Sequence, residues 1–266
     1  MIYSSLVKYS NVCYIGEGSQ ATVFSAVHEK TNKQVAIKRY TTNSISSLRE
    51  IRILKRIQNL KLKHSLDYVE SFIENDKLYI VTEYISGAEL HDFVTTDAFS
   101  TISAVRSISK KILKAVQELH ENNICHLDLK LENIMVDTKN EEVKLIDFGF
   151  SEIVKDEKSD EDRLITKFCG SVHYSAPEIV RNIPFNGKKA DIWSLGILFY
   201  VLVAQEFPFA GDDTNEVALK ILRNKLTYSS KFKDPLLVNL IEQMTQFDPD
   251  RRPSIKYLLQ HPFFLF

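Results

Sequence analysis

Short apolar runs alternate with turn-forming residues over the first third of the chain. The apolar runs cover residues 12–15, 22–27 and 35–38, and glycine-containing or polar stretches separate them at 16–20 and 30–33. Runs of this length that are rich in valine and isoleucine and bounded by turn residues are typical of antiparallel strands. The pattern therefore predicts that a small β-sheet begins near the amino-terminal end.

A helix and a hairpin are predicted next. Residues 47–57 carry apolar side chains at every third position, as on one stripe of a helix, namely Leu48, Ile51, Leu54 and Ile57. Two strand-like runs, at 72–73 and 78–85, flank Asn75 and Asp76, a pair that suits a tight hairpin turn. We therefore expect about five strands and one helix in this part of the chain.

Beyond Gly87 the spacing of apolar residues becomes helical. Residues 105–119 place them at threes and fours, which predicts a long amphipathic helix, and strand-like pieces follow at 134–136 and 143–146. Further helices are expected at residues 191–204, 214–223, 235–246 and 255–260. The run 192–204 is almost entirely apolar but shorter than the roughly 20 residues of a bilayer span, so it predicts a helix buried in protein.

The change of pattern divides the chain into two parts of one predicted domain, residues 1–266, of the α+β class. We expect a small lobe at 1–85, with an antiparallel sheet and one main helix, and a larger, mainly α-helical lobe at 86–266. The 266 residues fit one large or two small packed bodies at roughly 150 residues per domain. A junction near 83–89 predicts a cleft, which is a common place for a ligand.

Composition and charge exclude several classes of protein. Thirty-four basic and thirty-five acidic residues give a net charge of −1, so no overall positive field attracts nucleic acid or an anionic membrane. The three cysteines are odd in number and lack CxxC spacing, which argues against a disulfide framework and a zinc site. The first residues lack the features of a secretory signal. We expect an intracellular monomer, cytoplasmic or nuclear, without nucleic-acid or membrane partners.

Two segments of the predicted sheet are suited to holding phosphate. Residues 16–23 place Gly16 and Gly18 between two strands, where backbone N–H groups can approach phosphate oxygens. A plain glycine turn is the alternative, and a Rossmann site does not fit because no helix follows. Lys38 ends the third predicted strand among apolar neighbours, and a buried ammonium needs a carboxylate such as Glu50. A solvated lysine and a surface glutamate are the alternative reading.

Several polar residues lie close together at residues 126–133, between a predicted helix and a predicted strand. Asp147 follows at the end of an apolar run, where an unpaired charge would be costly. Asn133 and Asp147 offer the hard oxygen ligands that Mg²⁺ prefers, and Asp128 can accept a proton from a hydroxyl. Each residue alone could be a cap or a turn residue. Their joint occurrence is hard to explain by folding alone.

These motifs, together with others in the same order, resemble those of the eukaryotic-type protein kinases over nearly the whole chain. The matching segments are the glycine-rich loop with Gly16, Gly18 and Val23, the VAIK strand at 35–38, the catalytic loop with Asp128, Lys130 and Asn133, DFG at 147–149, APE at 176–178, and the core helix at 191–196. Lys130 and the pair Gly170-Ser171 are similar to serine/threonine kinases, and the calmodulin-dependent and related group is the most similar. The resemblance implies phosphorylation of serine or threonine hydroxyls in protein substrates.

The resemblance also implies ATP and Mg²⁺ as cofactors and a role for each matching residue. Lys38, steadied by Glu50, would hold the α and β phosphates, while Asp128 would accept the proton of the substrate hydroxyl. The implied catalytic residues are Lys38, Glu50, Asp128, Lys130 and Asn133, and the implied metal ligands are Asn133 and Asp147. The implied nucleotide site comprises Ile15, Gly16, Glu17, Gly18, Ser19, Gln20, Ala21, Thr22, Val23, Ala36, Lys38, Thr82, Glu83, Ile85, Glu89, Met135 and Asp147.

Three departures from the family pattern bear on regulation. Ala21 replaces the third glycine of the loop, which is a mild change. Leu127 stands where many kinases carry an arginine that binds a phosphorylated activation loop, and Lys167 occupies the usual phosphorylation position. Thr166 and Ser159 offer hydroxyls nearby. We therefore expect activity that does not depend on activation-loop phosphorylation.

Other features allow more than one interpretation. The acidic run at 156–162 is either a solvated loop or a docking patch for basic substrates. Glu178 and Arg252 resemble the family's buried ion pair that anchors the activation segment. A catalytically silent pseudokinase scaffold is the main alternative function, although Lys38, Asp128 and Asp147 are all present, and phosphorylation of a small molecule fits the peptide-binding motifs poorly.

Overall fold

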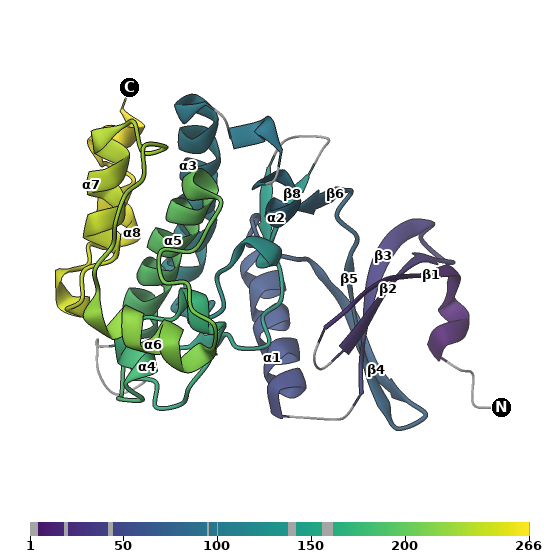
Figure 1. Ribbon diagram of the computed structural model, residues 1–266. Helices are drawn as coiled ribbons and strands as arrows, with labels where there is room; N and C mark the ends of the chain where they lie inside the picture. Colours follow the sequence, from purple (N-terminus) through teal and green to yellow (C-terminus); the bar gives the residue numbers. More distant parts are fainter. Residues whose placement is uncertain are drawn as a thin grey trace.

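A computed structural model of the chain shows two lobes joined by a narrow connection (Figure 1). It describes residues 5–18, 21–41, 45–94, 96–99, 101–137, 142–155 and 162–265. Ser19 and Gln20 of the glycine-rich loop, and residues 156–161 of the acidic run, lie outside the described residues. The predicted α+β fold with a sheet lobe and a helical lobe is confirmed.

The small lobe is built on one five-stranded antiparallel sheet with the order β1-β2-β3-β5-β4. Its strands are β1 (Tyr9–Glu17), β2 (Ala21–His28), β3 (Lys33–Tyr40), β4 (Tyr68–Glu74) and β5 (Lys77–Glu83). Asn75 and Asp76 have φ of 49° and 59°, the left-handed values that a two-residue hairpin turn requires. The predicted strands and the predicted hairpin are therefore both confirmed.

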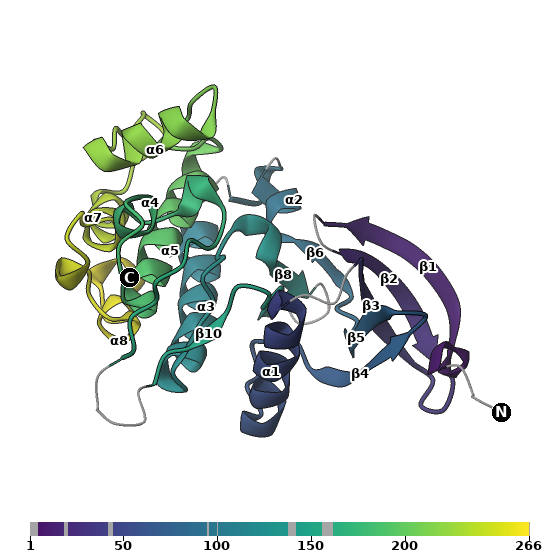
Figure 2. The ribbon, with the colours of Figure 1, turned by 90° about the horizontal axis from the view of Figure 1, so that it is seen from below.

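Helix α1 (Ile45–Leu60) lies between the sheet and the larger lobe (Figure 2). The predicted apolar stripe is wrong at Leu48, which is 61% exposed. The buried positions of the helix are Ser47, Glu50, Ile53, Leu54 and Ile57. Residues spaced strictly by three do not stay on one face of a helix that has 3.6 residues per turn. The buried face instead consists of residues spaced by three and four positions. Glu50 therefore lies on the buried face of the helix and is not a surface glutamate.

The larger lobe is mainly helical, and α5 passes through its centre (Figure 1). Its helices are α2 (Leu90–Val94), α3 (Ile102–Glu121), α4 (Pro177–Val180), α5 (Gly187–Ala204), α6 (Thr214–Arg223), α7 (Pro235–Met244) and α8 (Ile255–Leu258). Short 3₁₀ helices lie at Ser5–Lys8, Asp97–Phe99, Leu131–Asn133, Val172–Tyr174, Pro249–Arg251 and Pro262–Phe264. The helix predicted over the apolar run 192–204 is buried around most of its circumference, as expected. No described helix has the length and apolar character of a membrane span.

Five short strands frame the segments that carry the polar motifs. β6 (Gly87–Glu89), β8 (Ile134–Asp137) and β9 (Val143–Leu145) form a sheet in that order, and β7 (Ile124–Cys125) pairs with β10 (Glu152–Ile153). Residues 126–133 therefore leave β7 and enter β8, while 146–151 leave β9 and enter β10. Both polar loops begin and end in hydrogen-bonded backbone, which fixes their positions.

The main hydrophobic core crosses from one lobe to the other. It contains Ile53, Leu54 and Ile57 of α1 together with the buried residues of α3 and α5. A smaller cluster lies in the small lobe around Ile37 and Val81. Helix α1 thus packs with the larger lobe as well as with its own sheet, and the division of the chain at residue 85 stays a prediction.

A buried ion pair joins α4 to the segment before α8. Arg252 Nη1 and Nη2 donate to Glu178 at 2.6 and 2.8 Å, and neither side chain is more than 5% exposed. Arg252 also donates to the backbone carbonyls of Gln246, Lys189 and Phe247. The expected pair is present, with both carboxylate oxygens and most guanidinium donors satisfied.

We predict that Arg252→Ala destabilises the protein by about 3–5 kcal/mol, because it leaves the Glu178 carboxylate buried without a counter-ion. The larger lobe should then unfold at a much lower temperature, as measured by thermal melting. Arg251→Ala removes a neighbouring arginine that is 75% exposed and serves as the control. A melting curve unchanged by Arg252→Ala, with lost activity, would contradict this prediction.

Candidate active site

Lys38 lies between two carboxylates at the junction of the lobes. Its Nζ donates to Glu50 Oε1 and Oε2 at 3.1 and 3.0 Å and to Asp147 Oδ1 at 2.9 Å. Strand β3 holds Lys38 in register between Val23 of β2 and Ile80 of β5. The pairing of Lys38 with Glu50 expected from the sequence is present, and Asp147, 109 residues away, completes the group.

Sequence reasoning missed Tyr40, which belongs to the same group. Its hydroxyl donates to Glu50 Oε2, and the side chain is almost fully buried. Burial, followed by the charge of Glu50, raises the pKa of Tyr40 far above its ordinary value, so the hydroxyl remains a donor. The signal was its position two residues after Lys38, which places both side chains on the same face of the strand.

The charges of the group sustain one another. Burial disfavours the charged form of Lys38, but the negative charges of Glu50 and Asp147 outweigh it and raise the pKa of Lys38 above its ordinary value. Burial also opposes ionisation of Asp147, but Lys38 outweighs this and lowers the pKa of Asp147. The lysine is therefore cationic and Asp147 anionic around neutral pH.

The backbone at Asp147 turns sharply and directs its carboxylate to the junction. Its φ of 57° lies in the left-handed region, which is rare for a residue with a side chain and is often found at functional sites. The Gly149 N–H donates to Asp147 Oδ1 at 3.3 Å, and the Ile146 N–H donates to the carbonyl of Asn133 at 3.0 Å. This second bond ties the Asp147 segment to the loop at 126–133.

One buried carboxylate holds the start of that loop. Asp191, at the beginning of α5 and 0% exposed, accepts the N–H groups of His126 at 2.9 Å and Leu127 at 2.8 Å. It also bonds to His120 Nε2 at 2.8 Å. The sequence assigned Asp191 only to a helix motif, although a charge beside the apolar run 192–204 already required a partner.

Asp128 lies at the centre of the loop with a defined set of donors. Its Oδ1 accepts the backbone N–H of Ser171 at 2.9 Å and the Ser171 hydroxyl at 3.0 Å, and its Oδ2 accepts Asn133 Nδ2 at 3.0 Å. Lys130 Nζ lies 3.4 Å from Asp128 Oδ2 and donates to Ser171 Oγ at 3.3 Å. The structure thus brings together the predicted residues Asp128, Lys130 and Asn133. Ser171 was predicted only as part of a family motif.

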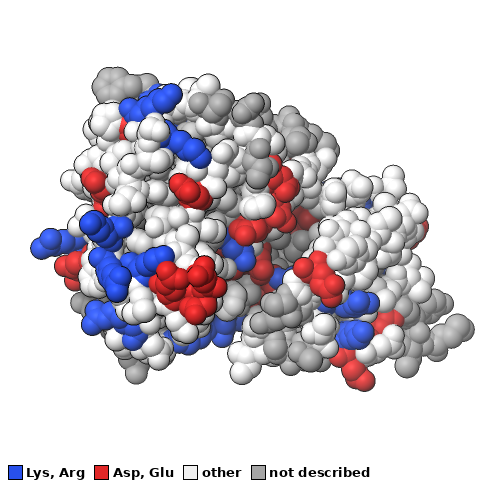
Figure 3. Space-filling model, in the orientation of Figure 1, with Lys and Arg blue, Asp and Glu red and all other residues white. Residues whose placement is uncertain are grey.

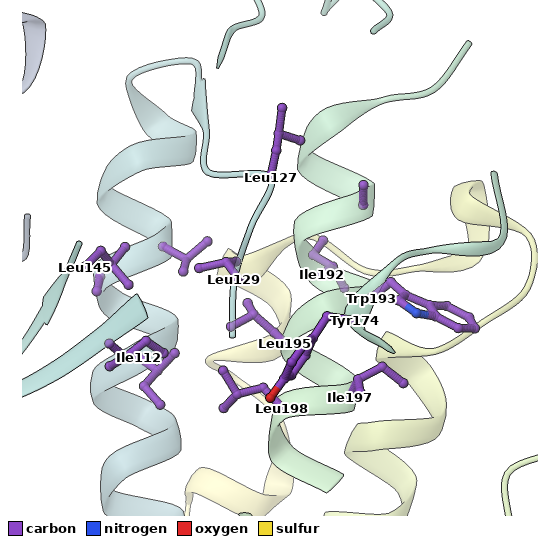
Figure 4. Close-up of a cluster of buried hydrophobic side chains, with 14 of the residues drawn as sticks. Ile112, Leu127, Leu129, Leu145, Tyr174, Ile192, Trp193, Leu195, Ile197 and Leu198 are labelled. Carbon is purple, nitrogen blue, oxygen red and sulfur yellow. The ribbon is translucent and has the colours of Figure 1, made fainter. Parts of the chain in front are cut away.

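A glycine allows the activation segment, which runs from DFG at 147–149 to APE at 176–178, to approach the loop at 126–133. Gly170 has φ +82°, and a Cβ on it would lie 2.5 Å from the carbonyl oxygen of Leu127. Leu127 itself is buried, and the segment that carries Leu127 and Leu129 runs between α3 and α5 (Figure 4). The apolar side chain of Leu127 therefore packs into the hydrophobic core at the position where many kinases carry an arginine.

The predicted nucleotide-site residues come from the sheet and the inter-lobe connection. Ile15, Gly16 and Glu17 lie on β1, where Gly16 pairs with Val23 and Glu17 with Thr22 of β2. Gly18 donates to the carbonyl of Ala21 at 2.8 Å. Ala36 pairs with Thr82, and Met135 pairs with Glu89. Glu83 ends β5, and Ile85 follows it in the connection to β6. Ser19 and Gln20 lie outside the described residues.

Asn133 and Asp147 have oxygens suited to Mg²⁺. Asn133 directs Nδ2 at the carbonyl and carboxylate of Asp128, so that, among the described residues, its Oδ1 can accept a ligand. In the same part of the chain Asp147 bonds to Lys38 and Gly149 through Oδ1, and its other oxygen could bind a metal. Amide and carboxylate oxygens are the donors that Mg²⁺ prefers, so this pair fits the ion.

Acidic side chains gather along the junction of the two lobes (Figure 3). Glu89 is the last residue of β6, and burial followed by the charges of Asp92 and Glu132 raises its pKa above the ordinary value. One oxygen of Glu132 is buried without a hydrogen-bond partner among the described residues. A cation that reached this group would relieve the repulsion between the carboxylates.

Comparisons with known proteins agree with these motifs. Residues 9–264 match the family described as the protein kinase domain. The chain is 34% identical over 266 residues to the maternal embryonic leucine zipper kinase of Xenopus tropicalis, covering 99% of this chain and 40% of that protein. It is 36% identical over 258 residues to the serine/threonine-protein kinase kin-29 of Caenorhabditis elegans, covering 93% of this chain and 30% of that protein. The chain thus spans less than half the length of these relatives.

Lys38→Met should raise the pKa of Asp147, because burial then acts without the opposing ammonium. In the native protein the folded-state pKa of Asp147 is lowered. Its stabilising contribution is therefore present above the unfolded pKa and is lost as pH falls through the folded pKa. In the variant this contribution is lost at neutral pH, so the melting temperature of the variant falls less on acidification than that of the native protein.

A carbon-13 NMR titration of the Asp147 carboxyl measures this pKa directly. Lys8→Met, which removes the exposed ion pair of Lys8 with Glu70, is the matched control and should leave Asp147 unchanged. Equal pKa values of Asp147 in the native protein and in Lys38→Met would show that Lys38 does not set its charge.

Proposed function

The chain belongs to the protein kinase domain family, and from this premise we propose that it transfers the γ-phosphoryl group of ATP to serine or threonine hydroxyls of protein substrates. One observation carries the proposal. Lys38 is ion-paired with Glu50 and Asp147, while Asp128 lies on a loop bonded to the Asp147 segment. These contacts support the roles that phosphoryl transfer needs, with Lys38 as the cation for phosphate, Asp147 as a carboxylate for the metal and Asp128 as the proton acceptor.

Lys38 would bind phosphate oxygens of the nucleotide, with Glu50 and Tyr40 fixing the direction of its ammonium. Asn133 and Asp147 would hold Mg²⁺, which when bound neutralises charge on the phosphate groups. Val23, Ala36 and Met135 would enclose the adenine, with Thr82 beside them and the backbone of Glu83 and Ile85 at its edge. The remaining predicted hairpin residues would cover the phosphates with their backbone N–H groups.

Asp128 would orient the substrate hydroxyl and accept its proton. The donors on its oxygens keep the carboxylate in one orientation, which favours a near-attack arrangement. Lys130, between Asp128 and Ser171, would stabilise charge on the transferred phosphoryl group. The name of the Caenorhabditis elegans relative, a serine/threonine-protein kinase, and the lysine two residues after Asp128 support a protein serine or threonine as the acceptor.

Asp128→Asn should lower the turnover number at least about 100-fold, because it removes the proton acceptor without changing the shape of the side chain. Phosphate transfer from ATP to a generic protein substrate gives the rate, and calorimetry with Mg·ATP should find binding retained. Asp250→Asn, at an exposed aspartate of the larger lobe, is the control.

The same comparison separates the alternative functions. A pseudokinase scaffold would bind Mg·ATP but show no transfer in either protein. A small-molecule kinase would turn over ATP without labelling any protein substrate. Equal transfer by the native protein and by Asp128→Asn would refute the proposed role of Asp128.

We propose further that the enzyme works without phosphorylation of its activation segment. The arginine that would bind such a phosphate is replaced by Leu127, which is buried in the apolar core. Lys167 occupies the expected phosphorylation position and is already ion-paired with Glu152. The ion pair of Lys167 with Glu152 therefore fixes the activation segment without phosphorylation.

Treatment of the purified protein with a broad-specificity phosphatase should leave its turnover number within about twofold of the untreated value, a difference of less than 0.5 kcal/mol in the barrier. Mass spectrometry establishes that the hydroxyls are unmodified after treatment. A collapse of turnover would show that a phosphate is required.

A further inference from the structure

Glu152, the first residue of β10, is paired with three cations from two parts of the chain, helix α1 and residues 163–167. Oε1 lies 3.2 Å from Arg49 Nε of α1 and is also paired with Lys167 Nζ of the activation segment. Oε2 lies 3.4 Å from Arg163 Nη2. The Glu152 side chain is 19% exposed, and Arg49 is far in sequence from the other two partners. No motif in the sequence indicated this group.

Strand β10 holds Glu152 in a fixed place relative to the catalytic loop. Glu152 pairs with Cys125 of β7, directly before the loop that begins at His126. β10 also lies against α1 (Figure 2). A carboxylate on such a strand is a fixed point against which both the helix and the activation segment can be located.

On the helix side, Glu152 acts next to the site itself. Arg49, which it holds, directly precedes Glu50, the partner of Lys38. Rotation or withdrawal of α1 would separate both pairs together. The ion pair of Arg49 with Glu152 therefore favours the helix position in which Glu50 reaches Lys38.

On the activation-segment side, the connection leads to Asp128. Lys167 precedes Gly170, which packs on the Leu127 carbonyl, and Ser171, which donates twice to Asp128. Fixing Lys167 restricts the few residues between it and Ser171. The Glu152 carboxylate thus influences the position of Glu50 through α1 and the position of Asp128 through the activation segment.

We propose that Glu152 is a positioning residue, a built-in anion that couples α1 and the activation segment to the catalytic loop. This inference rests on the proposed phosphotransfer function. An isolated exposed ion pair would contribute little. Here one carboxylate of low exposure is shared by three cations. Networks of charge-assisted hydrogen bonds contribute more free energy than single exposed ion pairs. Its role is to keep the segments in their active places, with no contact to substrate.

The test compares Glu152→Gln, which removes the charge and keeps the shape, with Glu152→Asp, which keeps the charge. We expect Glu152→Gln to lower kcat about tenfold, the effect of weakening one charge-assisted network by roughly one such bond, with a smaller change in KM for the peptide. Glu152→Asp should recover most of this loss. Glu216→Gln, which breaks the exposed pair of Glu216 with Lys220, is the control and should leave kcat unchanged.

Hydrogen exchange without nucleotide tests the coupling independently of activity. Glu152→Gln should accelerate amide exchange in residues 45–60 and 163–171 together, and Arg49→Gln should do the same. The variant that combines Glu152→Gln with Arg49→Gln should lose no more activity than Glu152→Gln alone, because Glu152→Gln already breaks the ion pair that Arg49→Gln removes.

Unchanged exchange in the two segments, or additive losses in the double variant, would overturn the inference. A lower melting temperature with unchanged kcat would also overturn it, since that pattern belongs to a merely structural residue. If the native protein shows no phosphate transfer, the proposed function fails, while the exchange experiment still decides whether Glu152 couples the two segments.

Discussion

An ammonium placed between two carboxylates is the interaction on which the arrangement of the lobes depends. Lys38 comes from the sheet, Glu50 from α1 and Asp147 from the larger lobe, so the group can form only when all three bodies are in register. None of these charges is stable when partly buried alone, and each compensates the desolvation of another. The cost of separating them therefore selects one arrangement of the junction.

Buried carboxylates also organise the irregular segments of the larger lobe. Asp191 binds two successive backbone N–H groups of the catalytic loop, and Glu178 binds the guanidinium of Arg252 with both oxygens. Loops cannot satisfy their backbone groups by regular pairing, so fixed acceptors from helices take the place of a sheet or helix partner. The long buried helix α5 supplies Asp191 from within the core.

The sequence predicted the long elements and the motif residues of the site but not the interactions that depend on packing. The predicted bounds of α6, residues 214–223, agree with the structure because its apolar period is uninterrupted. β7 and β10 have two residues each and exist only through their pairing with each other, so they carry no periodic signal. Tyr40 and Ser171 likewise acquire their contacts only when distant segments meet.

The sign of the charges around the activation segment follows from one substitution in the core. With Leu127 packed among apolar side chains, the catalytic loop offers no cation at that position for an added phosphate. Arg163 and Lys167 of the activation segment pair instead with an anion of the chain itself, Glu152. Reversing the charge of Lys167 or of Glu152 alone would place two like charges side by side, which is unfavourable. The lysine and the glutamate therefore depend on each other, and both suit a catalytic loop with leucine at position 127.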